Sequence, residues 1–180
     1  MPTKSPKPAS SSKTTKRKTR AKKGESKQPP ETNLTALEDG DALLNVGAAR
    51  AARFGRCGGR PLVTELEREV CDRLTGGGVA HSHRPRHFEI KLEDESLAAF
   101  APTIVVRGRG REGKVLVIET LEQANQDTVR KIAAFRALHG AEFFVSVIAP
   151  EAVLDEIPFD LADEMLATTE LYALIGRLTD

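Results

Sequence analysis

Three glutamates and one lysine, spread over separate parts of the chain, have the side chains that metal-dependent phosphodiester hydrolysis uses. Glu67 lies in the segment ELEREVCDRL, Glu119 ends the apolar run KVLVIE, and Glu122 follows that run closely. Carboxylates from separate elements can converge on Mg²⁺, and a nearby lysine can orient water or offset the charge of the phosphate. One interpretation is a catalytic site in which these three glutamates bind Mg²⁺ and Lys131 stabilises the transition state. The other is that they are ordinary carboxylates on a solvated helix face and at a strand end.

The helices that would position these groups are predicted from apolar spacing and capping residues. Leucine or valine recurs every four residues from Leu62 to Leu74, which predicts a helix that begins at Pro61 and ends before glycines 76–78. A later helix has Asn125 or Asp127 as its candidate N-cap. The expected helices cover 42–54, 61–75, 126–139 and 160–178.

Strands are expected where apolar residues alternate with polar ones or form short runs. FEIKLED alternates, whereas KVLVIE is nearly all apolar and therefore predicts a central strand. The expected strands cover 88–94, 102–106, 114–119 and 142–148. From residue 61 the order is helix, three strands, helix, strand, helix, which predicts an α/β fold with a mixed sheet and helices on its faces.

This order of elements resembles the PD-(D/E)XK nuclease superfamily, to which restriction endonucleases, Holliday-junction resolvases and RecB-type nucleases belong. A Pro-x dipeptide starts the second strand and an Ile-Glu pair ends the third, and the resemblance covers residues 61 to about 148. It implies a restriction-endonuclease-like mixed central sheet flanked by helices. The helix glutamate of the superfamily falls on Glu67, its proline on Pro102, and the acidic residue after its central strand on Glu119.

Two positions depart from the pattern of the superfamily. Its metal-binding aspartate falls on Thr103 and its lysine on Leu121. Threonine carries no charge and is a poor Mg²⁺ ligand, and leucine can neither orient water nor contact a phosphate. The resemblance therefore implies a nuclease-like domain that has lost hydrolysis. The alternative is that Glu122 and Lys131 replace the missing groups, and only in that case is Mg²⁺ the expected cofactor.

The segment HSHRPRH, at residues 81–87, holds three histidines but no complete set of local zinc ligands. Cys57 and Cys71 lie far outside the short spacings of zinc-binding motifs. We therefore expect a basic loop with surface histidines, whose Arg84 and Arg86 are candidate phosphate contacts. Two cysteines are also too few for a disulfide framework, which favours a reducing compartment.

The linker GRGREGKV spells two phosphate-binding motifs. Its three glycines match G-x-G-x-x-G, and its first seven residues match the P-loop, with Val115 in place of the expected Ser or Thr. Both motifs need a helix after the glycines, because phosphate binds at helix N-terminal amides, and here a strand follows. We expect a glycine-rich turn between two strands, with Arg109 and Arg111 as candidate phosphate contacts.

The N-terminal tail carries most of the positive charge. The first 31 residues hold ten Lys and Arg against two Glu, and the remainder holds seventeen against twenty-four Asp and Glu. Almost no apolar residue is present, so we predict a disordered tail over 1–33, a linker over 34–60 with GRCGGR as a flexible joint, and one domain over 61–180. Clustered Lys and Arg bind nucleic acid whatever its sequence, although a solubilising tail or a nuclear-localisation signal has the same composition. The candidate ligands are Lys16, Arg17, Lys18, Arg20, Lys22 and Lys23.

Several classes of protein are excluded by composition. No run of eighteen apolar residues exists, so no membrane-spanning helix or membrane partner is expected. The N-terminus has no apolar stretch of the kind that a signal peptide needs, and the expected location is intracellular, in the cytoplasm, nucleoid or nucleus. With no Trp and one Tyr, base-stacking platforms are not expected.

Three function classes follow. The first is a nucleic-acid-associated protein, with DNA as the expected partner, in which a nuclease-like domain serves binding or a larger DNA-processing complex. The second is an active Mg²⁺-dependent DNA nuclease with displaced ligands. The third is a protein-interaction module unrelated to nucleic acid, which the net charge of about −7 outside the tail favours, because an acidic surface repels DNA.

Overall fold

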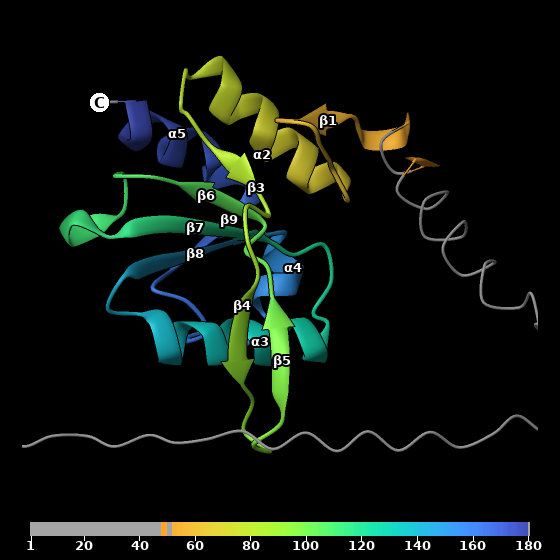
Figure 1. Cartoon of the computed structure of the whole chain (residues 1–180). Helices are drawn as coiled ribbons and strands as arrows, with labels where there is room; N and C mark the ends of the chain where they lie inside the picture. Colours follow the sequence, from red (N-terminus) through yellow and green to blue (C-terminus); the bar gives the residue numbers. More distant parts are fainter. Residues whose placement is uncertain (1–47, 50–51, 180) are drawn as a thin grey trace, which may run out of the picture. The chain divides into compact units, whose positions relative to one another are not determined.

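A five-stranded mixed sheet is the centre of the fold (Figure 1). The computed structural model describes residues 48–49 and 52–179. In spatial order the strands are β3 (Ser82–His83), β6 (Ile104–Val106), β7 (Val115–Thr120), β8 (Phe143–Ala149) and β9 (Glu164–Ala167). Strand β6 runs antiparallel to both of its neighbours, β3 and β7, whereas β7, β8 and β9 are parallel to one another. The apolar run KVLVIE thus forms the central strand, as its sequence predicts.

Helices cover both faces of this sheet (Figure 1). On one face, α2 (Glu65–Gly76) and α5 (Leu171–Thr179) pack on alternate residues of β6 and β7, such as Ile104 and Ile118. On the other face, α3 (Gln126–His139) packs on the intervening residues, such as Val105 and Val117. Successive side chains of a strand point to opposite faces, so both faces of a sheet covered in this way must be apolar. A single turn of helix, α4 (Glu151–Leu154), follows β8.

Two antiparallel hairpins lie outside the central sheet. The first joins β1 (Arg56–Cys57) to β2 (Arg60–Pro61), and the second joins β4 (Phe88–Lys91) to β5 (Leu97–Phe100). The second hairpin packs Ile90 and Phe100 into the same core as α3. Short 3₁₀ turns, η2 (Arg111–Gly113) and η3 (Thr168–Glu170), precede β7 and α5.

Most of the elements expected from the sequence are present. The helix over 126–139 has the expected bounds, and the Asn125 side chain caps it by accepting a hydrogen bond from the Thr128 amide at 3.1 Å. The strands expected over 88–94, 102–106, 114–119 and 142–148 are β4, β6, β7 and β8, with ends that differ by up to three residues. An α/β fold with a mixed sheet is therefore confirmed.

Three expectations are wrong. Pro61 does not open the helix: it ends β2, and α2 begins at Glu65 after its N-cap Thr64. GRCGGR is not a joint but the first hairpin, because Gly58 and Gly59 adopt the positive φ angles that a tight turn requires. The last helix does not cover 160–178, because residues 164–167 pair with β8 as a parallel strand and the helix starts only at Leu171.

Some predictions fall on the undescribed part of the chain. The tail over 1–33 and its six candidate nucleic-acid ligands lie outside the described residues, as does most of the segment 42–54, of which residues 48–49 and 52–54 are helical. Within the described residues, no helix is long and apolar enough to cross a membrane.

Candidate functional site

Glu119 lies at the end of the central strand and is almost completely buried, with 3% of its surface exposed. Both of its carboxylate oxygens accept hydrogen bonds from Thr103, which precedes the neighbouring antiparallel strand β6. The Thr103 amide donates to Oε1 at 2.8 Å, and the Thr103 hydroxyl donates to Oε2 at 2.6 Å. Burial raises the pKa of Glu119 to about 7, although these hydrogen bonds oppose the increase.

Glu67 lies in the first turn of α2 and is 1% exposed. Its Oε1 accepts hydrogen bonds from His83 Nδ1 and Arg84 Nη2, both at 2.7 Å, and its Oε2 accepts one from the Val63 amide at 2.7 Å. Burial raises the pKa of this carboxyl, but the three hydrogen bonds outweigh that effect and the pKa lies below its ordinary value. Glu67 is therefore held as a paired, buried carboxylate.

Arg84 links the two glutamates electrostatically. Its positive charge lowers the pKa of Glu119, whereas the negative charge of Glu67 raises it, so the three side chains share one environment. The Arg84 guanidinium also donates to the Pro61 carbonyl at 2.8 Å. We call Glu67, Arg84, Thr103 and Glu119 the carboxylate centre.

A Mg²⁺ ion does not fit the carboxylate centre. Glu67 and Glu119 direct their oxygens at donors within the protein, and Arg84 already supplies the positive charge that a metal would bring. Among the described residues, no set of three or more metal-ligating side chains in mutual range includes either glutamate. The expected aspartate is Thr103, whose hydroxyl donates to Glu119. The centre therefore has the composition of an internal polar network.

The other two candidate catalytic residues are placed differently. Glu122 is exposed, and its Oε1 accepts a hydrogen bond from the Leu66 amide at 2.9 Å, which brings it to the start of α2. Lys131 pairs with Asp127 on its own helix, at 2.6 Å between Nζ and Oδ2. The structure thus brings Glu67 and Glu122 to the start of α2, with Glu119 near enough for the charge of Glu67 to raise its pKa, but pairs the lysine with another carboxylate.

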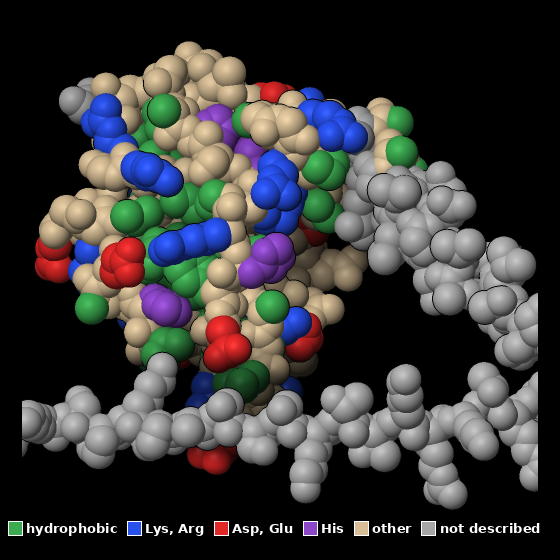
Figure 2. Space-filling view, viewed as in Figure 1, with side chains coloured by type: hydrophobic (Ala, Val, Ile, Leu, Met, Phe, Trp, Pro, Cys, Tyr) green, Lys and Arg blue, Asp and Glu red, His purple; other side chains and the backbone are tan. Residues whose placement is uncertain are grey.

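The candidate phosphate contacts differ in their availability. Arg84 is half-buried, and its guanidinium already pairs with Glu67. Arg86 is 61% exposed, and its nearest carboxylate oxygen lies 3.9 Å away. Arg109 is exposed on the turn after β6, whereas Arg111 pairs with Glu164 at 3.2 Å. Figure 2 shows Lys and Arg side chains gathered over β3, β6 and β7 on the visible face.

The glycine-rich linker is a turn between the antiparallel strands β6 and β7, as expected. No helix follows its glycines, because only the three-residue turn η2 separates them from β7. Gly110 donates its amide to the Lys114 carbonyl at 3.0 Å, and a Cβ on Gly110 would lie 2.8 Å from the carbonyl carbon of Lys114. Close packing within the turn therefore explains this glycine without a phosphate ligand.

The histidine segment departs from its expected surface position. His83 is buried, because β3 pairs with β6 and places it against α2; only His87 is fully on the surface. Moreover, one ligand atom from each of Cys57, Cys71, His81 and His83 lies within 4.8 Å of the others. Spacing motifs could not reveal this group, since its members come from the first hairpin, from α2 and from β3. A signal was nonetheless present, because two cysteines and two histidines are together a complete zinc-ligand set.

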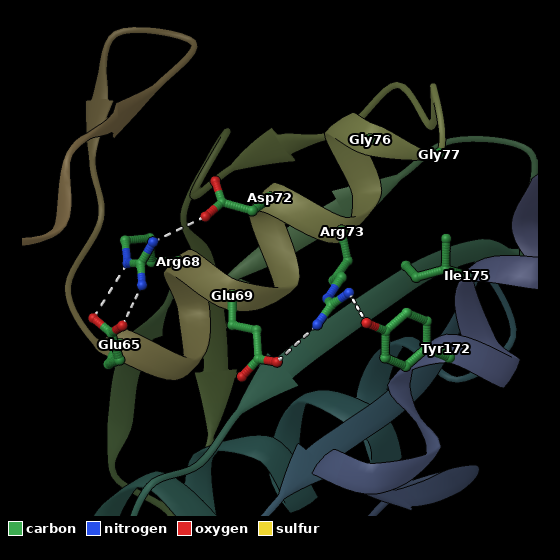
Figure 3. A pocket seen from close by; sticks show the side chains of 9 residues that line it. All are labelled: Glu65, Arg68, Glu69, Asp72, Arg73, Gly76, Gly77, Tyr172 and Ile175. Carbon is green, nitrogen blue, oxygen red and sulfur yellow. Dashed lines mark hydrogen bonds and ion pairs between the residues drawn. The ribbon is translucent and has the colours of Figure 1, made fainter.

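A hollow of about 650 Å³ lies between α2 and α5 (Figure 3). Its charged side chains pair with one another, as in the contacts of Arg68 with Asp72 at 3.0 Å and of Arg73 with Glu69 at 3.6 Å. The Arg73 guanidinium also lies 4.0 Å from the centre of the Tyr172 ring. These internal contacts make the hollow a weaker candidate site than the carboxylate centre.

Comparison with known proteins yields no relative for this chain: no family model matches it, and no curated protein or solved structure is significantly similar to it. A fold by itself does not determine function. Any assignment therefore depends on the geometry of the carboxylate centre and on the distribution of charge.

Proposed function

We propose that this protein associates with nucleic acid, chiefly through its basic tail, and that its nuclease-like domain does not hydrolyse the phosphodiester backbone. One observation carries the proposal: both glutamates of the carboxylate centre are paired inside the protein. Arg84 and His83 donate hydrogen bonds to Glu67, and Thr103 donates two to Glu119. A centre of this kind retains the layout of a nuclease site while its carboxylates serve the fold.

The order and pairing of the elements support a restriction-endonuclease-like fold. Helix α2 precedes an antiparallel set of strands, and α3 connects the parallel strands β7 and β8. The positions that the resemblance assigns to catalysis, Glu67, Thr103 and Glu119, meet at one place in this arrangement. Convergence of residues that lie far apart in the sequence is what the resemblance predicts.

The proposed absence of hydrolysis follows from two missing features, free metal-binding carboxylates and a lysine beside the phosphate. Two-metal or one-metal hydrolysis needs ionised oxygens free to bind the cation, and a cation to polarise the attacking water. The position of the superfamily's lysine is Leu121, which is 5% exposed and packs in the core with α3. This buried leucine can therefore neither contact a phosphate nor orient water.

Binding of nucleic acid is supported by exposed basic side chains. Arg86 and Arg107 line a hollow of about 380 Å³ beside β3 and β6, and Arg109 is exposed nearby in sequence. The tail adds ten Lys and Arg over its first 31 residues. Contacts of this type neutralise phosphates and release counterions, so they give affinity that depends on salt and little on sequence.

The test is binding of full-length protein to a labelled duplex, measured by fluorescence anisotropy over a range of salt concentrations. The matched variant replaces the six basic tail residues between 16 and 23 with Gln, and the control replaces Lys91, which is paired with Glu95 on the second hairpin. We expect a steep salt dependence whose slope falls by up to about 5 in the tail variant and by less than about 1 in the control. Absence of binding at low salt would contradict the proposal and favour a protein-interaction module.

A further inference from the structure

We propose that two cysteines and two histidines beside the carboxylate centre bind one Zn²⁺ ion in a closed, structural site. The four ligands are Cys57, Cys71, His81 and His83. Their ligand atoms all lie within 4.8 Å of one another. This proposal does not depend on nucleic-acid binding, and either one can fail without the other.

Two sulfur-to-nitrogen distances within the group match a tetrahedral zinc site. With Zn–S and Zn–N bonds of ordinary length, a sulfur and a nitrogen on one tetrahedral ion lie about 3.6 Å apart. His81 Nε2 lies 3.6 Å from Cys57 Sγ and 3.4 Å from Cys71 Sγ. The protein therefore holds these three atoms at ligand separation, and the fourth ligand atom, from His83, lies within 4.8 Å of each of them.

Hydrogen bonds on the far side of each imidazole ring orient the nitrogens for metal binding. His81 Nδ1 lies 2.8 Å from the Val79 carbonyl oxygen, which can only accept, so Nδ1 carries the proton and Nε2 presents its lone pair. His83 Nδ1 lies 2.7 Å from the Glu67 carboxylate, which fixes its ring in the same way. A carboxylate or a carbonyl behind a ligating histidine is the arrangement that zinc sites use.

An unpartnered buried nitrogen points independently to a ligand. The His83 side chain has no exposed surface, and its Nε2 atom has no hydrogen-bond partner among the described residues. A buried polar atom without a partner costs free energy, so native proteins rarely retain one. A metal bond from Nε2 would satisfy this atom.

The chemistry of the ligands selects the metal and the role. Two thiolates and two imidazoles in tetrahedral array favour Zn²⁺ over the hard cations Mg²⁺ and Ca²⁺, which prefer oxygen. Four protein ligands leave no open position for water or substrate, so the site is structural.

The ion would join three separate elements. Cys57 lies in the first hairpin, whose strands are two residues each, Cys71 lies in α2, and the histidines lie at and just before β3. A hairpin of this size is not stable alone in water. We infer that zinc fixes the hairpin on the domain and that Glu67, at the position of a catalytic glutamate, acts as a positioning residue for His83.

The test begins with the untagged full-length protein and its metal content by mass spectrometry. We expect about one Zn per chain. After removal of zinc with a chelator, titration with Co²⁺ should give the visible absorption bands of a tetrahedral site and a sulfur-to-metal charge-transfer band. Added Zn²⁺ should displace the Co²⁺ and abolish these bands. His81→Gln should abolish these bands, whereas His87→Gln, on the same segment but fully exposed, should leave them unchanged.

Glu67→Gln separates positioning from ligation. We expect it to retain the Co²⁺ bands but to weaken zinc binding by about 10-fold to 100-fold in chelator competition. Circular dichroism checks that each variant is folded, and the half-buried His81 is chosen because its replacement disturbs the core least. A disulfide between Cys57 and Cys71 in the purified protein would overturn the proposal. Purified protein with reduced thiols and no bound metal would also overturn it, as would an equal loss of the Co²⁺ bands in His87→Gln.

Discussion

Replacement of Glu119 by glutamine tests whether this carboxylate is an internal group of the fold. The buried side chain accepts two hydrogen bonds from Thr103, at 2.8 and 2.6 Å. In Glu119→Gln the amide oxygen can still accept from the Thr103 amide, and the amide NH₂ can donate to the Thr103 hydroxyl. The substitution therefore removes the buried charge and retains the contacts.

The pKa of Glu119 sets the size and the sign of the effect. Burial raises this pKa from 4.5 to about 7, so between these values the folded protein binds a proton that the unfolded chain releases. The stability of the wild type is therefore fully present below pH 4.5 and falls as the pH rises to about 7. At about 1.4 kcal/mol per pH unit, the loss amounts to about 3 kcal/mol.

We expect Glu119→Gln to equal the wild type at pH 4.5 and to exceed its free energy of unfolding by up to about 3 kcal/mol at pH 8. The assay is urea unfolding followed by far-UV circular dichroism, since the chain has no Trp for fluorescence. Glu89→Gln, at an exposed position on β4, is the control, and its difference from the wild type should not change with pH. A pH-independent difference for Glu119→Gln would refute the reasoning.

Three further predictions concern the carboxylate centre and the glycine-rich turn. Thr103→Val removes the hydroxyl donor to the buried strand-end glutamate and should lower the free energy of unfolding by about 1 to 3 kcal/mol, whereas Thr103→Ser should cost less; equal losses in urea unfolding would show that the hydroxyl is unimportant. Arg84→Ala removes the arginine partner of the buried Glu67, which keeps its hydrogen bonds from His83 and Val63, and should cost about 3 kcal/mol. Arg86→Ala should cost less than about 1 kcal/mol, because the exposed guanidinium lies over the Phe88 ring, and should lower the salt slope of DNA binding by about 1. The reverse pattern in unfolding and anisotropy would contradict these roles. Gly110→Ala should destabilise the turn through contact with the Lys114 carbonyl, and an unchanged melting temperature would mean that the turn adapts freely.

Local signals in the sequence were sufficient for the main elements of the fold. The helix over 126–139 has a capping residue and a regular apolar face, and both depend only on neighbouring residues. The central strand has an unbroken apolar run because both of its faces are covered by helices. Strand β9 was not predictable in this way, because its four residues become a strand only by pairing with β8. The same residues carry a helical apolar spacing that extends the expected last helix.

The carboxylate centre was predictable only in part. The resemblance placed Glu67, Thr103 and Glu119 together, because the antiparallel pairing of adjacent strands brings such positions to one end of the sheet. The partnership of Glu67 with Arg84 and with His83 depends on how the chain turns after β3, which no local pattern reports. The same long-range folding assembles the Cys and His group from three separate elements.

The proposed loss of hydrolysis can be tested on one gel of full-length protein with labelled single-stranded, duplex and branched DNA, in Mn²⁺, in Mg²⁺ or in EDTA, beside Glu119→Gln. We expect the DNA to be shifted equally under all three conditions and in the variant, without cleavage. Cleavage that requires the metal and is lost in Glu119→Gln would contradict it. That result would show that the glutamates around the start of α2 bind a catalytic metal in place of their internal partners.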